Sequence, residues 1–238
     1  MKLIKGDCFD QLKLIKSKSV DLILTDPPYI ISRETNFSKG GGNEEKYGKL
    51  SMQFGEWDKE KLDLEPLFKE FYRILKPGGT LIIFYDVFKL QEIYNFAAKY
   101  KFKQPRVGIW DKSNAVPINA RINYLSNARE YFLSFCKGKK GTFNSYYDKA
   151  FYSYAIVNGK LRTHPTQKPI KLLEDIIRVN SNEYDTILDC FMGTGSTGIA
   201  CINTNRDFIG IELDENYFNI AEQWLKNHEK LNMLNKTK

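Results

Sequence analysis

The amino-acid sequence predicts an α/β fold in which a mostly parallel β-sheet carries helices on both of its faces. Short apolar segments typical of buried strands alternate along the chain with segments whose apolar residues recur at helical spacing. Several of the apolar segments stop abruptly at residues that favour turns. A chain of 238 residues is long enough to bury a full core, and we expect one domain that spans residues 1–238.

Seven segments have the composition of strands, so the predicted sheet is seven-stranded. They cover residues 3–4, 20–25, 80–85, 106–110, 130–136, 186–189 and 208–211. The segment 20–25 is mostly apolar and fits a buried strand of a parallel sheet. It stops at Asp26-Pro27-Pro28-Tyr29, because two consecutive prolines cannot continue a sheet ladder.

Helical spacing of apolar residues predicts helices between these strands. They cover residues 10–16, 64–75, 87–100, 170–179 and 217–225, and a helix rich in small residues follows Gly198. We expect Pro77-Gly78-Gly79 to end the second of these helices. We expect the tail from Asn232 to fray.

Composition excludes several classes of protein. No apolar run approaches the ~18 residues that span a bilayer, and the first residues lack the apolar stretch of a signal peptide. The four cysteines show no C-x-x-C spacing and the chain has two histidines, which argues against a disulfide scaffold and predicts no metal site. We therefore expect a reduced, cytoplasmic protein with no membrane partner.

The positive charge is concentrated in one stretch of the chain. The net charge is +7, whereas residues 101–171 hold 14 Lys and Arg against 3 Asp and Glu. Aromatic residues lie among these charges, and such a stretch can follow phosphates and stack on bases, or can be a solvated edge over part of the core. Residues 30–58, with three consecutive glycines and a charged run, predict a mobile loop.

Residues 186–212 form a strand, a glycine turn, a helix, a second strand and an acidic residue, which is the pattern of a nucleotide-binding half-unit. Gly193, Gly195 and Gly198 match the dinucleotide fingerprint and would suggest NAD or FAD. Asp189 before the turn instead resembles the S-adenosylmethionine loop of methyltransferases. Glu212 follows Gly195 by 17 residues, the place of a carboxylate that accepts ribose hydroxyls. Glycines that serve only packing remain an alternative.

The Asp26-Pro27-Pro28-Tyr29 turn suits methylation of an amine on an aromatic ring. The lone pair of such an amine is delocalised, so an acceptor pair that binds both N–H groups would direct it at a methyl donor. Asp26 can supply a carboxylate and Pro27 a carbonyl in a rigid turn. Tyr29 can stack on a base that has left its helix. The alternative is a proline turn that merely ends a strand.

These motifs resemble those of the DNA amino-methyltransferases, specifically the circularly permuted β class that modifies adenine. In that class the Asp-Pro-Pro-Tyr motif comes first, a target-recognition region follows, and the cofactor loop lies near the C-terminus, as here. His164-Pro165-Thr166-Gln167-Lys168-Pro169 resembles the motif upstream of the loop, and Gly6-Asp7-Cys8 resembles the segment that contacts the cofactor adenine. Cys190 departs from the usual proline and Thr194 from the frequent serine.

The resemblance implies a Rossmann-like methyltransferase that transfers a methyl group from S-adenosylmethionine to the N6 amine of adenine in a specific short sequence of double-stranded DNA. The implied catalytic residues are Asp26, Pro27, Pro28 and Tyr29. The implied cofactor-binding residues are Asp7, Cys8, Asp26, Thr166, Gln167, Lys168, Asp189, Phe191, Gly193, Thr194, Gly195, Ser196, Thr197, Glu212 and Leu213. Residues 113–162 are the implied target-recognition insertion, with DNA contacts expected from Arg121, Lys137, Lys139, Lys140, Tyr146 and Tyr147.

Other functions remain open at this point. Cytosine-N4 methylation uses the same motif, usually with serine first, so Asp26 favours adenine. Enzymes that methylate RNA or a protein glutamine generally place the cofactor loop before the catalytic motif, which is the opposite order. An NAD-dependent oxidoreductase would leave Asp26 without a task, and a catalytically silent DNA-binding module is the third class. The implied partners are double-stranded DNA, a second copy of the chain and a cognate restriction endonuclease.

Overall fold

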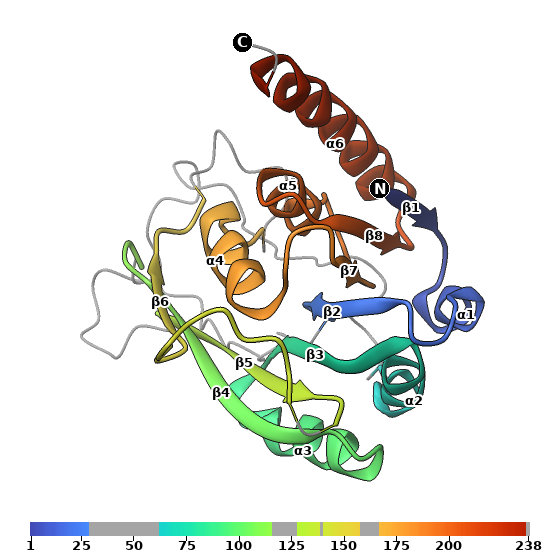
Figure 1. Cartoon of the computed structure of the whole chain (residues 1–238), viewed down its shortest axis with the longest axis vertical. Helices are drawn as coiled ribbons and strands as arrows, with labels where there is room; N and C mark the ends of the chain where they lie inside the picture. Colours follow the sequence, from blue (N-terminus) through green and yellow to red (C-terminus); the bar gives the residue numbers. More distant parts are fainter. Residues whose placement is uncertain (29–61, 116–127, 139, 158–166, 237–238) are drawn as a thin grey trace, which may run out of the picture. The chain divides into compact units, whose positions relative to one another are not determined.

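The computed structural model describes residues 1–28, 62–115, 128–138, 140–157 and 167–236 (Figure 1). Met1–Pro27 and Leu64–Lys238 form one compact unit that contains every helix and strand described below, and Pro28–Asp63 is a separate unit. The predicted loop over residues 30–58 lies outside the described residues. No helix in the described ranges is both long enough and apolar enough to cross a membrane.

The described residues form an eight-stranded sheet with the order β1-β8-β7-β2-β3-β5-β4-β6. The strands are β1 (Lys2–Lys5), β2 (Val20–Thr25), β3 (Leu75–Tyr85), β4 (Lys103–Lys112), β5 (Arg129–Cys136), β6 (Phe151–Tyr154), β7 (Thr186–Asp189) and β8 (Asp207–Glu212). Only β5 runs antiparallel to its neighbours, so the mostly parallel sheet is confirmed. The eighth strand is β6, which has four residues and pairs with β4 at the sheet edge.

Helices cover both faces of this sheet, as the sequence predicts. They are α1 (Cys8–Leu14), α2 (Glu65–Ile74), the 3₁₀ helix η2 (Val87–Lys89), α3 (Leu90–Lys99), α4 (Ile170–Asn180), α5 (Ser196–Asn203) and α6 (Glu215–Lys236). α4 contacts α5 and α5 contacts α6, whereas α2 contacts both α1 and α3. Figure 1 shows α4 and α5 on one side of the central strands and α2 and α3 on the other.

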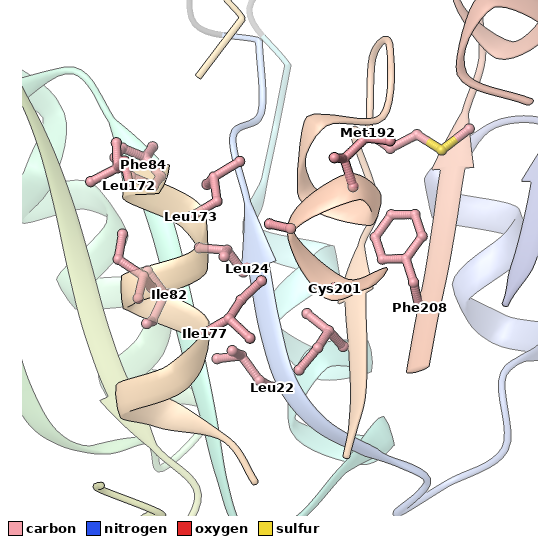
Figure 2. Close-up of a cluster of buried hydrophobic side chains, with 14 of the residues drawn as sticks. Leu22, Leu24, Ile82, Phe84, Leu172, Leu173, Ile177, Met192, Cys201 and Phe208 are labelled. Atoms are coloured by element: carbon pink, nitrogen blue, oxygen red, sulfur yellow. The ribbon is translucent and has the colours of Figure 1, made fainter. Parts of the chain in front are cut away.

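A cluster of buried apolar side chains joins the central strands to α4, α5 and α6 (Figure 2). Leu22 and Leu24 of β2 are 0% and 1% exposed and lie against Leu173 and Ile177 of α4. Burial of each such side chain stabilises the fold by about 1.5–3 kcal/mol. The cluster therefore fixes α4 on β2 and β3, and with it the segment that enters α4 from Lys168.

Several element boundaries differ from the predicted ones, and two of these differences have a clear physical reason. β3 begins at Leu75, immediately after α2, so Pro77-Gly78-Gly79 opens a strand instead of forming a turn after the helix. Hydrogen bonds explain this, because Gly78 N donates to Lys137 O at 2.8 Å and Lys137 N donates to Gly79 O at 2.9 Å. α6 continues to Lys236, and Asn232 does not fray because its amide donates to Ile202 O at 3.3 Å.

Gly108 of β4 lies directly under the ring of Phe132, which is 3% exposed. A Cβ atom at residue 108 would lie 1.9 Å from Cζ of Phe132, so the ring would have to move. We expect Gly108→Ala to lower the free energy of unfolding by about 1–3 kcal/mol, the usual cost of overpacking. Urea denaturation measures this, and Phe132→Leu in the Gly108→Ala background should recover part of the loss. An unchanged free energy for Gly108→Ala would contradict the packing.

Candidate active site

The candidate site lies where the parallel strands β2, β7 and β8 end. β5 runs the opposite way, so its first residues reach the same edge of the sheet, where Tyr131 pairs with Tyr85 at the end of β3. Ligands bind in the crevice outside the carboxyl ends of the strands in open α/β sheets. The edge therefore brings together side chains that lie far apart in the sequence.

Asp26 follows β2 directly, and its two carboxylate oxygens have different surroundings. Oδ2 accepts a hydrogen bond from Nζ of Lys168. Oδ1 is buried and accepts no hydrogen bond within the part of the chain that the structure describes. Burial raises the pKa of Asp26 above its ordinary value, while the charge of Lys168 opposes that rise. Oδ1 is therefore an acceptor available to a substrate, since a buried acceptor is costly to leave unpaired.

Lys168 belongs to a row of four side chains with alternating charge, in the order Asp26, Lys168, Glu130 and Lys112. Its side chain is 6% exposed, and Nζ lies 3.0 Å from Oε2 of Glu130 and 4.9 Å from the centroid of the Phe84 ring. On the other side of Glu130, Nζ of Lys112 lies 2.8 Å from Oε1. Burial raises the pKa of Glu130, but the two lysines outweigh burial and hold it below its ordinary value. Glu130 is therefore ionised at neutral pH.

Asp189 is the last residue of β7, and it connects the glycine turn to the turn that contains Asp26. Its Oδ1 accepts hydrogen bonds from Thr25 Oγ1 at 2.8 Å and Phe191 N at 3.1 Å, and its Oδ2 accepts one from Thr197 Oγ1 at 2.7 Å. Asp189 is 4% exposed, and this burial raises its pKa to about 6 despite the three hydrogen bonds. Thr25 precedes Asp26, so one carboxylate sets the spacing between the two turns.

The glycine turn has the backbone conformation that its sequence requires. Gly193 and Gly195 have φ of 54° and 91°, a left-handed conformation in which residues with a Cβ are strained. A Cβ at Gly193 would meet nothing within 4 Å, whereas one at Gly195 would lie 3.2 Å from Ala221 and Leu225. Gly195 thus packs the turn onto α6, and Gly193 borders open space.

Carboxylates and small residues from β1 and β8 border the same turn. Glu212 accepts from Gly193 N at 2.9 Å through Oε2 and from Asp214 N at 2.8 Å through Oε1, and burial raises its pKa. Asp7 accepts from Phe9 N at 2.8 Å and begins α1. Burial raises the pKa of the Cys8 thiol to about 12, so Cys8 is not a nucleophile. Leu213 is 61% exposed.

The residues around the turn fit a cofactor that contains a nucleoside. The open space beside Gly193 is a cradle that a larger residue would fill. Glu212 offers a carboxylate for hydroxyl groups, and the exposed Leu213 offers an apolar surface for a ring. The other predicted residues of the turn, Phe191, Thr194, Ser196 and Thr197, lie here too, and Gln167 adjoins Lys168. Tyr29 and Thr166 lie outside the described residues.

Lys137 is buried, whereas the sequence analysis expected an exposed residue that contacts DNA. The residue is 9% exposed, and its Nζ donates to Leu75 O at 2.7 Å and to Tyr72 O. The amine also lies 4.7 Å from the centroid of the Tyr72 ring. Burial, with a contribution from Lys18, lowers the pKa of Lys137. The amine is therefore bound to the end of α2 and is not available to a phosphate.

Other predicted DNA contacts lie at the end of the sheet where β3 begins, whereas Asp26 lies at the end where β2 stops. Thr142 N donates to Gly78 O at 3.4 Å near the start of β3, and Asn144 N donates to Val179 O at 2.7 Å at the end of α4. Tyr146 and Tyr147 follow and are 97% and 93% exposed. The structure therefore does not bring these tyrosines, or the exposed Lys140, to the catalytic edge. Arg121 and Lys139 lie outside the described residues.

We expect Lys137→Ala to lower stability and to leave DNA binding intact. The substitution removes the donor for two backbone carbonyl groups at the end of α2, which costs about 1–3 kcal/mol for buried acceptors. Urea denaturation should show the loss, while the salt dependence of DNA affinity should stay that of the wild type. Lys140→Ala, at an exposed residue of the same loop, is the matched control for stability. A stable Lys137→Ala variant with weakened DNA binding would restore the sequence-based expectation.

Sequence reasoning missed three residues of this site, namely Thr25, Lys112 and Glu130. Thr25 and Glu130 lie at strand ends, where a polar residue is common and carries little signal. Lys112 belongs to a basic stretch, so its charge suggested a solvated or DNA-facing residue. A weak signal was available for Glu130, because a lone acidic residue opens the otherwise apolar segment 130–136 within a basic region.

The fold and the site together define a Rossmann-like methyltransferase. Residues 20–223 match the family model described as DNA methylase, N6_N4_Mtase. The chain is 33% identical to Type II methyltransferase M.HinfI of Haemophilus influenzae over 94% of this chain and 68% of that protein. It is 31% identical to Type II methyltransferase M2.DpnII of Streptococcus pneumoniae over 98% of this chain and 92% of that protein.

Solved structures agree with the family match. A crystal structure of the M1.HpyAVI-SAM complex superposes with a TM-score of 0.71 at 28% identity, and the alignment covers 94% of this chain and 98% of that one. The cytosine-N4-specific PvuII DNA methyltransferase has a TM-score of 0.70 at 17% identity, over 97% of this chain and 91% of that one, which shows the shared fold. The chain belongs to the N6/N4 DNA methylase family. It is an S-adenosylmethionine-dependent DNA methyltransferase, so the oxidoreductase alternative falls.

Proposed function

We propose that this enzyme methylates the N6 amine of adenine within a specific short sequence of double-stranded DNA. The observation that carries the proposal is Oδ1 of Asp26, a buried acceptor with no hydrogen bond among the described residues, beside the cofactor turn. The hydrogen bond from Thr25 to Asp189 ties the two turns together. Because Asp26 precedes Asp189 in the chain, we also propose the circularly permuted order of the β class.

The catalytic turn acts on the amine itself. Asp26 Oδ1 accepts one N–H of the target and the Pro27 carbonyl accepts the other, which concentrates the lone pair on nitrogen. S-Adenosylmethionine, when bound, supplies an electrophilic methyl group on its sulfonium sulfur. The methyl–sulfur bond would break as the N–C bond forms, and the cofactor would leave as a neutral thioether. The nitrogen would then carry one proton too many, and the carboxylate at residue 26 is the base placed to take it. Most of the acceleration comes from this positioning.

The target base must leave the double helix to reach Asp26. The N6 amine lies within the Watson–Crick pair, and an enzyme that acts on it extrudes the nucleotide at a cost of about a few kcal/mol. Tyr29 is our candidate for stacking on the extruded base. We also propose a cytoplasmic enzyme, since that is where it would meet DNA and S-adenosylmethionine. The turn after β2 would thus bind the base, and the turn after β7 would bind the cofactor. These two strands pair directly, so the two binding turns are neighbours.

The chain's own residues are assigned to the cofactor by their chemistry. Asp189 is a carboxylate for the ammonium group, and Glu212 is one for the ribose hydroxyls. Asp7, Cys8, Phe191 and Leu213 border the adenine side. The proposed set also includes Thr166, Gln167, Gly193, Thr194, Gly195, Ser196 and Thr197. Lys168 is treated separately below, because its amine contacts Asp26.

Recognition of DNA is proposed for the insertion over residues 113–162. Lys140, Tyr146 and Tyr147 face away from the catalytic edge, so we propose that they meet DNA or a second copy of the chain instead of the extruded base. Two relatives, M.HinfI and M2.DpnII, are Type II methyltransferases, which supports a cognate restriction endonuclease as partner. Arg121 and Lys139 remain candidate phosphate contacts.

Transfer of labelled methyl groups tests the substrate. The enzyme is incubated with S-adenosylmethionine carrying a labelled methyl group and with matched double-stranded DNA, single-stranded DNA and RNA. We expect label in double-stranded DNA, and only in fragments that contain one short sequence. Label in RNA, or label spread evenly over unrelated DNA fragments, would contradict the proposal.

A further inference from the structure

A row of alternating charges crosses the catalytic edge of the sheet. Its members come from four separate segments: Asp26 after β2, Lys168 before α4, Glu130 of β5 and Lys112 of β4. The side chains of Lys168, Lys112 and Glu130 are 6%, 16% and 22% exposed. Two negative and two positive charges make the row neutral as a whole. Opposite charges next to one another offset part of the cost of burying each charge.

The contacts of Lys168 leave one orientation for Asp26. Nζ of Lys168 donates to Oδ2, lies 3.0 Å from Glu130 and sits over the Phe84 ring. The backbone next to Lys168 is fixed as well, because α4 begins at Ile170 and packs on β2 and β3. An ion pair at one oxygen of a carboxylate fixes the direction of the other oxygen, which here is the unpaired Oδ1.

We infer that Lys168 is a positioning residue that holds Asp26 by Oδ2, and that Glu130 and Lys112 hold Lys168 in place so that Oδ1 meets the target amine. The inference rests on the proposed role of Asp26. The sequence analysis assigned Lys168 to cofactor binding, and the inference gives it a different role. Glu130 and Lys112 acquire a positioning role that no sequence motif indicated.

Burial raises the pKa of Asp26 most strongly, and the charges around its carboxylate shift that pKa further. Among the described residues, the charged groups that act on this carboxylate are Lys168, Lys112 of β4, Glu130 of β5 and Asp189 of β7. Lys168 and Lys112 favour the ionised form, and Glu130 disfavours it. Loss of the Lys168 charge therefore raises the pKa of Asp26. Loss of the Glu130 charge lowers that pKa, because it removes a repulsion and leaves Lys168 to Asp26 alone.

Two substitutions with opposite expected shifts test the inference. Single-turnover methyl transfer to genomic DNA is measured as a function of pH for the wild type, Lys168→Met, Lys168→Arg and Glu130→Gln. Lys168→Met should lower the neutral-pH rate by about 100-fold and move the acid limb to higher pH by about one unit, with S-adenosylmethionine affinity within about 3-fold of wild type. Glu130→Gln should move the acid limb to lower pH. Lys168→Arg should recover most of the rate, because it keeps the charge.

A matched control separates the row from its neighbourhood. Lys171→Met changes a lysine three residues further on, whose side chain is 73% exposed and pairs with Glu174. Its rate and pH profile should equal those of the wild type. Circular dichroism confirms that each variant is folded. If Lys168→Met does not fold, the Glu130→Gln profile alone decides, because this variant keeps the shape of the side chain.

Several results would overturn the inference. If the acid limbs of Lys168→Met and Glu130→Gln move in the same direction, or do not move, the row is not coupled to the titration of Asp26. A Lys168→Met enzyme that binds S-adenosylmethionine more than about 10-fold more weakly at an unchanged single-turnover rate would return Lys168 to the cofactor. The Asp26→Asn variant distinguishes a failure of the inference about Lys168 from a failure of the proposed role of Asp26. An active Asp26→Asn enzyme refutes the role of Asp26, whereas an inactive one beside a wild-type-like Lys168→Met refutes the inference alone.

Discussion

Replacement of Asp26 by asparagine is expected to lower the rate of methyl transfer by about 100- to 10,000-fold while the cofactor still binds. The amide keeps the shape of the carboxylate but loses its charge. Its NH₂ group must face either the amine of Lys168 or the N–H groups of the target, and both are donors. The variant therefore sets a donor against a donor in either orientation, and it loses the charge that concentrates the lone pair on nitrogen. Single-turnover kinetics with labelled S-adenosylmethionine measure the rate, and calorimetry measures the affinity.

The matched control is Asp10→Asn, an aspartate on α1 whose side chain is 73% exposed. It should leave rate and affinity unchanged. The melting temperature of Asp26→Asn must show a folded protein under the assay conditions. A folded Asp26→Asn enzyme that transfers methyl groups at the wild-type rate would show that the carboxylate does not bind the amine.

Replacement of Asp189 by alanine is expected to remove cofactor binding and to weaken the fold. Thr25, Phe191 and Thr197 all donate to this carboxylate, and each donor would lose its partner. A buried donor left unpaired costs about 1–3 kcal/mol. We therefore expect a fall in the free energy of unfolding of several kcal/mol by urea denaturation, and loss of measurable S-adenosylmethionine binding by calorimetry. Wild-type-like binding by a folded Asp189→Ala variant would exclude Asp189 from the cofactor site.

The affinity of the wild-type enzyme for S-adenosylmethionine should depend on pH through the ionisation of Asp189. The pKa of Asp189 is raised to about 6 by burial, so the group is ionised above that pH and protonated below it. Only the ionised form attracts an ammonium group. Cofactor affinity should therefore be constant above about pH 6 and fall about 10-fold per pH unit below it. Asp189→Asn should bind weakly with no such dependence. Affinity that rises on acidification would contradict the assignment.

Local sequence was enough to predict both turns of the site. The catalytic turn follows from the apolar segment 20–25 and the two prolines that stop it. The cofactor turn follows from glycines at residues 193 and 195, whose left-handed conformation few other residues adopt. The acidic residue at the end of the next strand, Glu212, completes a pattern that spans fewer than thirty residues. In each case the deciding physics lies within one short stretch of chain.

The charged row could not be predicted, because it depends on tertiary contacts. Lys168 and Asp26 are 142 residues apart, and Glu130 reaches them only because β5 runs antiparallel. The burial of Lys137 could not be predicted for the same reason. Gly138, Lys139 and Lys140 follow it in the sequence, which suggests an exposed loop, yet its amine lies against the end of α2. The strand β6 was missed because four residues with alternating exposure give little periodic signal.

The most direct test of the central claim is the chemical identity of the methylated nucleoside. DNA treated with the enzyme and labelled S-adenosylmethionine is digested to nucleosides, which are separated and identified by mass spectrometry. A carboxylate at residue 26 and the resemblance to the adenine-modifying class predict that the label appears as N6-methyldeoxyadenosine and forms at least about 100-fold more slowly with Asp26→Asn. Label found as N4-methyldeoxycytidine, or label that forms at the wild-type rate with Asp26→Asn, would contradict the account.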